Sequence, residues 1–492
     1  MRSRPVLRRT PLVALVLVCA IAGASPAGDA AGDPDRRFAT RVIKVDGPLG
    51  SPAVRSHVRF SLSIGFNAVW VPSRFAAAWT AADAPDGPRL EPEFLALARE
   101  SRSSGVGLLL VMEPVRDHDG SFVFSDERQA ARLDKLMRIA RRDAGVHDFV
   151  LSFFDTPLQL TELGDRLDYG PSAARAQVAL ARALARRLRG DDRLWLEPSV
   201  TSDRFLGDPE LPYSVALLEA LDGLDRRVGI VWSGPQPISP ELTVEQVRAA
   251  ETRFGGRKLL FDDRYPANGS EPRIPLALVL GPLRARAPAV ADRIDTYAVT
   301  PMTELGASRL ALLTIADFLT DPDGYDADAS WERAKRRLAG EDERAYEALR
   351  TQAAEWGGWV GTRNYHTAAD ENPRTAAASL ADPAAFAAWI WPVRTYPGRI
   401  DELAGLDDTL FRDELLLTMA RRLAVARAAA PARRLLVPET SVEEAAEARR
   451  SIERQRAGLS GEPAVRVALD RFLVHAGLGA LIADGPPPVP LP

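Results

Sequence analysis

The stretch HDFVLSFFDTP, residues 147–157, decides the fold. Phe149, Val150, Leu151 and Phe153 belong to an apolar run that stops at Asp155. Continuous rather than alternating hydrophobicity is typical of a parallel strand that helices cover on both faces. A carboxylate at the end of such a strand is well placed for chemistry, and glycoside hydrolysis usually needs two acidic groups. The stretch therefore raises the question whether Asp155 is half of a catalytic pair.

Seven further runs of this kind are spread over residues 40–335, each rich in Val, Ile, Leu or aromatics and each with Gly, Pro, Ser or an acid near its end. They are RVIKVDG (41–47), FNAVWVPS (66–73), GVGLLLVMEP (105–114), RLWLEPSV (193–200), VGIVWSGP (228–235), KLLFDDRYP (258–266) and DTYAVTPM (295–302). Helical segments such as 127–143 and 172–190 lie between them. Eight such units predict an α/β fold, a (β/α)8 TIM barrel over residues 41–335. A doubly wound sheet is the alternative, but no Gly-rich phosphate motif follows the first run.

From about residue 336 the pattern becomes helical, as in 413–430 and 442–459. We expect a helical bundle domain over 336–480 and a Pro-rich tail over 481–492. The N-terminus has a charged start, a short apolar run and small residues near residue 24, which predicts a signal peptide over 1–24 and a linker over 25–40. Export to the periplasm or medium follows, with no stable membrane span after processing. A lipoprotein anchored through Cys19 is the rival, although the bulky Val18 disfavours it.

Composition excludes several classes of function. The net charge of −4 gives no electrostatic case for binding nucleic acid. Cys19 is the only cysteine and lies in the signal peptide, and the five histidines are scattered, so we expect no metal and no cofactor. The sequence does not set the oligomeric state.

In a (β/α)8 barrel the chemistry lies at the carboxyl ends of the strands. The polar and aromatic residues at those ends are Asp46, Ser73, Arg74, Glu113, Asp155, Glu197, Trp232, Asp262, Asp263, Tyr265 and Thr300. Several acids and aromatics that converge on one mouth favour a sugar site over a phosphate site.

Five stretches, in order, resemble the family 84 glycoside hydrolases, which are retaining β-N-acetylglucosaminidases that include O-GlcNAcases and bacterial hyaluronidase-type enzymes. They are GPLGSPA (47–53), IVWSGPQPIS (230–239), LLFDDRYPANG (259–269), LVLGPLRAR (278–286) and the segment 300–331 that begins TPMTELGASRL. The resemblance implies substrate-assisted catalysis, an exception to the two-carboxylate scheme. One Asp of a Phe-Asp-Asp motif holds the substrate acetamide, and the next is the general acid/base.

Aligning GVHDF (145–149) with the family without a gap puts Phe154 at the first Asp and Asp155 at the second. Asp155 is then the general acid/base, and the acetamide-holding group is absent. A one-residue gap gives the opposite assignment, with Thr156 in place of the acid. Either register leaves one carboxylate, so the resemblance implies a divergent member with an eroded catalytic pair.

Other family positions have changed too. The opening-loop aromatics are Pro48 and Leu49, the active-site Lys falls on Ser73 beside Arg74, and the strand-five Tyr is Thr201. Two Asn positions hold Asp263 and Thr300, and the Asp that grips distal hydroxyls is Gly269. The substrate contacts implied by the remaining matches and replacements are Trp232, Asp262, Asp263, Tyr265, Asn268 and Thr300.

Three functions remain open at this point. The first is a glycosidase of altered specificity in which Glu113 or Glu197 supplies the missing acid or nucleophile. The second is an exported protein that binds a glycan, or a partner, at the barrel mouth without catalysis. The third is a conventional β-N-acetylglucosaminidase.

Overall fold

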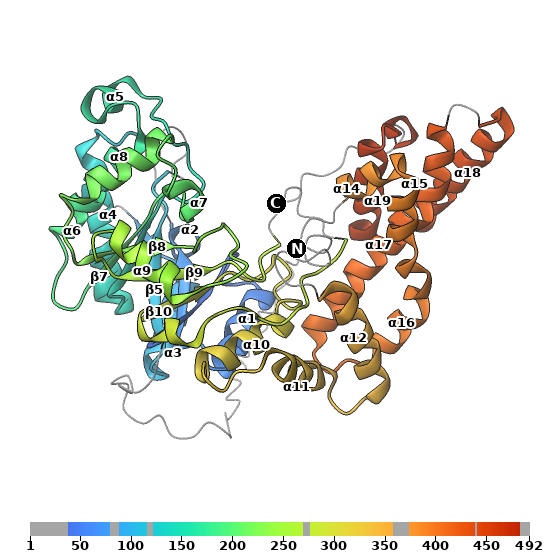
Figure 1. The fold of residues 1–492 in the computed structure, drawn as a ribbon, viewed down its shortest axis with the longest axis horizontal. Helices are drawn as coiled ribbons and strands as arrows, with labels where there is room; N and C mark the ends of the chain where they lie inside the picture. The colour runs from blue at the N-terminus through green and yellow to red at the C-terminus, as the bar shows by residue number, and fades with distance from the viewer. Residues whose placement is uncertain are drawn as a thin grey trace, which may run out of the picture.

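The computed structural model describes residues 38–78, 88–115, 122–268, 276–357, 373–437 and 440–482. Its N-terminal part is a closed barrel of eight parallel strands in the order β1-β10-β9-β8-β7-β6-β5-β2 (Figure 1). The strands are β1 (Thr40–Lys44), β2 (Ala68–Pro72), β5 (Gly107–Met112), β6 (Asp148–Ser152), β7 (Arg193–Glu197), β8 (Val228–Trp232), β9 (Leu259–Asp263) and β10 (Thr296–Val299). A short antiparallel pair, β3 (Ala77–Ala78) with β4 (Arg89–Leu90), follows β2 in the chain. The predicted (β/α)8 barrel is confirmed.

Helices surround the barrel and carry the chain from strand to strand. They are α1 (Pro52–Ser63), α2 (Ser73–Ala76), α3 (Pro92–Ser103), α4 (Glu127–Ile139), α5 (Leu163–Tyr169), α6 (Ala173–Ala185), α7 (Asp203–Leu206), α8 (Pro212–Leu221), α9 (Val244–Arg253) and α10 (Arg309–Thr320). Caps fix several starts: the Asp126 carboxylate accepts the N–H of Arg128 at α4, and Thr243 with Gln246 forms a capping box at α9.

Two apolar layers hold the barrel together. One lies inside it and contains Val42, Trp70, Val150, Trp195 and Leu260, among others. The other lies between strands and helices and uses the alternate residues of the same strands. Because both layers are apolar, the strand sequences show no alternation. Gly229 of β8 faces Trp195, and a Cβ at that position would lie 2.3 Å from the indole ring, so only glycine fits beside this side chain.

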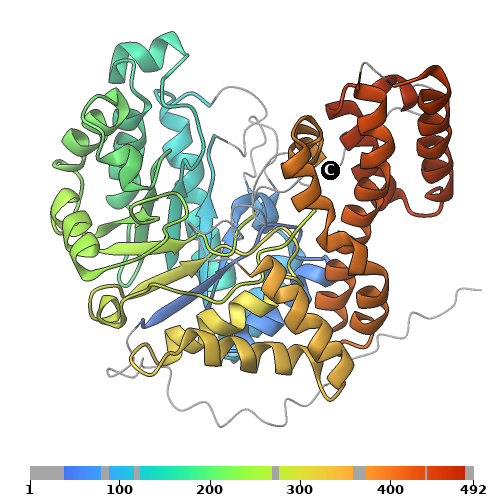
Figure 2. The same cartoon turned by 45° about the vertical axis from the view of Figure 1, so that its right-hand side comes forward.

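Beyond the barrel the described chain is helical, which confirms the expected helical region (Figure 2). Its helices are α11 (Ala327–Ala339), α12 (Glu343–Trp356), α14 (Pro373–Ala378), α15 (Pro383–Ile390), α16 (Tyr396–Leu403), α17 (Thr409–Leu436), α18 (Val442–Gly458) and α19 (Pro463–His475). The long α17 packs against α18 and α19 around a core that includes Val425, Ile452 and Phe472. The domain boundary expected between residues 335 and 336 falls inside α11, so the chain has no break there.

The helical region is fastened to the barrel by polar contacts. Arg309 at the start of α10 forms an ion pair with Asp408, and the Ala307 N–H donates to Glu414 at 2.8 Å. The backbone N–H of Leu280 donates to the carbonyl of Trp356 at 3.1 Å. The expected signal peptide with Cys19 lies outside the described residues, as do most of the expected linker and of the Pro-rich tail. Among the described helices, none combines the length and the apolar character needed to cross a membrane.

Candidate functional site at the barrel mouth

The two faces of each strand divide the sequence-predicted site residues into two groups. Residues that continue the inner layer point into the barrel mouth, whereas their neighbours point toward the surrounding helices. Leu260 belongs to the inner layer, so Asp262 faces inward, and Phe261 belongs to the outer layer, so Asp263 faces outward. By the same rule the inward group contains Glu113, Glu197, Asp262 and Thr300, and the outward group contains Trp232, Asp263 and Tyr265.

The centre of the mouth is an ion cluster around Asp262. Its fully buried carboxylate lies 2.9 Å from Lys44 Nζ and 3.2 Å from Arg264 Nε, and it accepts the Thr300 hydroxyl at 3.0 Å. Burial alone would raise the pKa of Asp262, but the two cations outweigh it and the pKa is lowered. Asp262 therefore stays ionised and organises the ends of β1, β9 and β10.

Glu197 is the second inward acid of this cluster. Its carboxylate is almost completely buried, accepts the Ser152 hydroxyl at 2.5 Å and lies 3.9 Å from Lys44 Nζ. Burial raises the pKa of Glu197, because the more distant Lys44 offsets only part of the desolvation and Asp262 adds repulsion. The two carboxylates beside Lys44 thus have pKa values shifted in opposite directions.

Asp155 lies on the turn after β6, where its side chain is exposed. Its backbone is in the left-handed region at φ 58°, which Asp tolerates better than most residues, and its N–H donates to the Ser199 carbonyl at 3.1 Å. The preceding Phe154 is half-buried, and the Arg264 guanidinium carbon lies 4.0 Å from the centre of its ring. Thr156 donates its hydroxyl to the Phe153 carbonyl at 2.6 Å. The turn thus places the Asp155 carboxylate next in the chain to the Phe154 ring, which contacts the Arg264 guanidinium.

Glu113 belongs to a separate group at the edge of the mouth. Arg74 of α2 donates to the buried Glu113 carboxylate and, through Nη2, to Asp46 at 2.6 Å. The Glu113 backbone N–H donates to the Ser73 hydroxyl at 3.3 Å. Arg74 therefore bridges the acids that follow β1 and β5.

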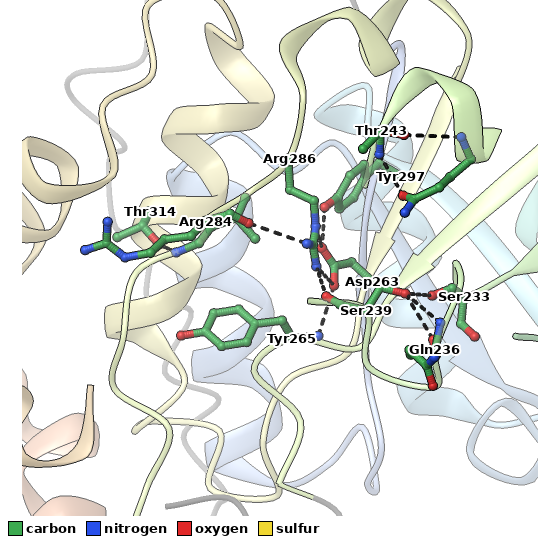
Figure 3. Close-up of polar contacts among 12 residues, drawn as sticks. Ser233, Gln236, Ser239, Thr243, Asp263, Tyr265, Arg284, Arg286, Tyr297 and Thr314 are labelled. Atoms are coloured by element: carbon green, nitrogen blue, oxygen red, sulfur yellow. Dashed lines mark hydrogen bonds and ion pairs between the residues drawn. The ribbon is translucent and has the colours of Figure 1, made fainter. Parts of the chain in front are cut away.

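The outward group forms structural contacts (Figure 3). Asp263 is fully buried, and its two oxygens lie 2.9 and 3.0 Å from Arg286 Nε and Nη2. Tyr297 donates its hydroxyl to the same carboxylate, and the Tyr265 N–H donates to it at 3.1 Å. Burial alone would lower the pKa of Arg286, but the Asp263 charge raises it. The Tyr265 hydroxyl donates to the Gly281 carbonyl at 2.7 Å, so both residues tie the segment around 281–286 to the end of β9.

Trp232 and Asn268 also have partners within the protein. The Trp232 ring is fully buried against Phe261, and its indole N–H donates to Asp203 at 2.8 Å, so it offers no exposed surface to a ligand. Asn268 donates its amide to Glu304 at 2.9 Å and accepts the Thr303 N–H at 3.2 Å. Gly269, one of the replaced family positions, lies outside the described residues.

Lys44, Arg264 and Ser152 are the mouth residues that sequence reasoning missed. Lys44 is the charged residue inside the apolar run VIKV (42–45), and its Nζ also lies 4.1 Å from the centre of the Trp70 ring. A lysine inside a buried strand was a usable signal, since such a charge requires a partner. Arg264 carried a weaker signal, because arginine after a strand is most often a surface residue.

One cluster away from the mouth has metal-ligating side chains. Oxygen and nitrogen atoms of His147, Asp191 and Asp192 lie within 4.8 Å of one another. Arg141 already pairs with Asp192 at 2.7 Å, and the Arg189 N–H donates to it at 2.7 Å. The buried carboxylate of this cluster is thus neutralised by a cation of the protein itself.

The comparisons with known proteins agree with this architecture. A solved structure of a mutant O-GlcNAc hydrolase from Thermobaculum terrenum is similar with a TM-score of 0.59 and 19% identity, covering 90% of this chain and 93% of that one. The structure of CpGH84B is similar with a TM-score of 0.55 and 16% identity, covering 88% and 77%. At these identities the likeness shows a shared fold. A family model for β-N-acetylglucosaminidase matches residues 89–354, more than half of the 492-residue sequence. The chain therefore belongs to the β-N-acetylglucosaminidase family.

Proposed function

We propose that this protein is exported, binds glycans at the barrel mouth, and has a much reduced ability to hydrolyse β-N-acetylglucosaminides. One observation carries the proposal: the turn after β6 reads Phe154-Asp155, and Arg264 stacks on the Phe154 ring at 4.0 Å. Substrate-assisted hydrolysis needs one carboxylate for the acetamide and another for proton transfer. A phenyl ring accepts no N–H bond and stabilises no developing positive charge as a carboxylate does.

The other acids of the mouth support the proposal. Asp262 is held by Lys44 and Arg264, and Glu113 is held by Arg74. Lys44 and Arg264 are largely buried, so Asp262 cannot move to a substrate without leaving buried cations unpaired, which costs several kcal/mol. Asp155, on its exposed turn, is the acid best placed to meet a sugar.

Loss of one of the two catalytic carboxylates has a large effect on rate. The carboxylate that is lost at Phe154 would stabilise the charge of the cyclic intermediate, and removing one such preorganised stabilising group costs about 10²- to 10³-fold in kcat. An acetamide left unpaired in a closed pocket costs about a further 1 to 3 kcal/mol. We therefore expect aryl β-N-acetylglucosaminides to be cleaved at least about a hundredfold more slowly than by a family member with both acids.

A panel experiment tests the proposal. The chain without residues 1–24 is incubated with chromogenic β-N-acetylglucosaminide and with plain hexosides, and binding of the corresponding oligosaccharides is measured by calorimetry. Glycan binding together with slow or absent N-acetylglucosaminide cleavage supports the proposal. Turnover at the rate of a two-acid family member refutes the reduced activity, and absence of binding to every glycan tested refutes the glycan site.

A second candidate is a rebuilt hydrolase that uses Glu197. The opposite pKa shifts of Glu197 and Asp262 favour it, because environments that push two carboxyl groups apart often mark an acid and its ionised partner. Cleavage of a plain hexoside that is lost in Glu197→Gln but kept in Asp155→Asn would establish this candidate. Loss in Asp155→Asn alone would exclude it.

A further inference from the structure

A groove with basic lining runs along the outside of α1. We call it the α1 groove, and it is lined by Arg55, Ser56, Arg59, Phe60, Ser63 and Arg309. Its volume is about 510 Å³, within the range of sites for small ligands. Figure 1 shows α1 close to α10, which contributes Arg309, on the side of the barrel nearest the helical region. The groove therefore lies outside the ring of strand ends that forms the mouth.

Two of the three arginines that line the α1 groove have no acidic partner in the described part of the chain. Arg55 and Arg59 lie one turn apart on α1, both are exposed, and neither has an ion-pair partner among the described residues. Arg337 of α11 places its guanidinium carbon 6.0 Å from the centre of the Phe60 ring and likewise lacks an acidic partner in the described part of the chain. No Asp or Glu is among the described lining residues. Two unpaired guanidinium groups line the hollow and a third, that of Arg337, lies near the Phe60 ring, so the groove attracts an anion.

Arg309 gives the groove a fixed wall. Its guanidinium is buried, pairs with Asp408 and donates to the Ser56 hydroxyl at 2.6 Å. Its guanidinium carbon lies 4.6 Å from the centre of the Phe60 ring. The Nε of Arg309 is buried and has no hydrogen-bond acceptor among the described residues, which leaves a donor unsatisfied. The position of the ring and of the Ser56 hydroxyl is thus set before any ligand arrives.

We propose that the α1 groove is a second binding site, separate from the mouth, for an acidic saccharide whose carboxylate or sulfate group is held by Arg55 and Arg59. A guanidinium binds such oxygens through two parallel hydrogen bonds. The half-buried Phe60 side chain lines the groove and gives a sugar an apolar surface, and the Ser56 and Ser63 hydroxyls suit its polar groups. The choice of a saccharide over another anion rests on the proposed glycan function. The existence of an anion site rests instead on the unpaired arginines of the groove.

Calorimetry with defined probes tests the site. The full chain without residues 1–24 is titrated at low salt with a size-defined sulfated oligosaccharide, the same oligosaccharide without sulfates, inorganic sulfate, and phosphatidylglycerol vesicles. The variants are Arg59→Ala and the double variant Arg55→Ala/Arg59→Ala. Arg248→Ala is the matched control, because Arg248 is an exposed arginine on α9 without an ion pair in the described residues. All three positions are exposed, so the variants keep the fold.

The sulfated oligosaccharide should bind, and Arg59→Ala should weaken that binding about tenfold, with a greater loss in the double variant and none in Arg248→Ala. Binding should also weaken as salt is raised. The saccharide assignment is overturned if the unsulfated oligosaccharide or inorganic sulfate binds as tightly as the sulfated oligosaccharide. It is also overturned if the vesicles bind more tightly than the sulfated oligosaccharide. Binding that survives the double variant but is lost in Asp155→Asn places the ligand at the mouth and overturns the groove. Binding that persists in Asp155→Asn keeps the groove even if the proposed function of the mouth fails.

Discussion

Replacing Asp263 with asparagine separates a structural role for this residue from a role in ligand binding. The wild-type carboxylate accepts from Arg286 at 2.9 and 3.0 Å, from the Tyr265 N–H at 3.1 Å and from the Tyr297 hydroxyl. The asparagine side chain would keep one acceptor oxygen but remove the charge that compensates a fully buried guanidinium. We therefore expect Asp263→Asn to destabilise the barrel.

The size of the effect follows from this burial. The side chains of Asp263 and Arg286 are each 1% exposed, and removing one charge of such a pair costs about 3 to 5 kcal/mol. The remaining hydrogen bonds of Arg286, such as that to the Ser239 carbonyl at 3.0 Å, favour the lower end. With an m-value of about 2 kcal/mol/M, the urea midpoint falls by about 1.5 to 2.5 M, and the lower end is favoured.

Urea unfolding of three variants checks the argument. Asp126→Asn is the control, because Asp126 caps α4 near the surface and asparagine caps almost as well, so less than about 1 kcal/mol is lost. The double variant Asp263→Leu/Arg286→Met removes both charges and should recover much of the loss. A midpoint for Asp263→Asn within about 0.3 M of wild type, or a loss of glycan affinity without a loss of stability, would refute the structural role.

Three further predictions concern the turn after β6, the contact between Glu414 and the barrel, and export. Phe154→Asp should raise the kcat/KM for an aryl β-N-acetylglucosaminide while Thr156→Asp should not, and the reverse result would establish the gapped alignment. Burial raises the pKa of Glu414 to about 7 from 4.5, so the stability that its protonated form contributes is present below pH 4.5 and is lost as pH rises through 7. Thermal unfolding of Glu414→Gln should therefore depend less on pH between about 4.5 and 7.5 than unfolding of the wild type, and an unchanged dependence would count against this role. Mass spectrometry of the protein from its own cells should find the first 24 residues removed, and a mature chain that retains them or carries a lipid on Cys19 would contradict the signal peptide.

The barrel could be predicted from the sequence because its strands are apolar on both faces. Each of the eight runs contains all or most of one strand of the barrel, in chain order. For the same reason the sequence did not show which side chains of a strand face into the barrel and which face the helices. In the run KLLFDDRYP nothing distinguishes the inner face from the outer one, so the sequence predicts the same role for Asp262 and Asp263. In the structure Asp262 faces the mouth and Asp263 faces the helices.

The ion cluster of the mouth could not be predicted for a different reason. Lys44 and Asp262 are more than two hundred positions apart, and only closure of the barrel through β1, β10 and β9 brings them to 2.9 Å. A pairing of that kind depends on strand order and register, which local sequence does not encode. Local sequence also gave no exact position for the start of the helical region. The expected boundary near residue 336 lies inside α11, and the helical spacing is the same on both sides of it.

The most direct test of the central claim is the steady-state hydrolysis of an aryl β-N-acetylglucosaminide by the wild type and by Asp155→Asn. If Asp155 is the one remaining acid/base of the eroded pair, the wild type cleaves this substrate very slowly, and the residual rate falls to background in Asp155→Asn. The folded state of the variant is checked by circular dichroism and by its urea midpoint. Efficient hydrolysis by the wild type that persists in Asp155→Asn would contradict both the alignment of the turn and the role of Asp155.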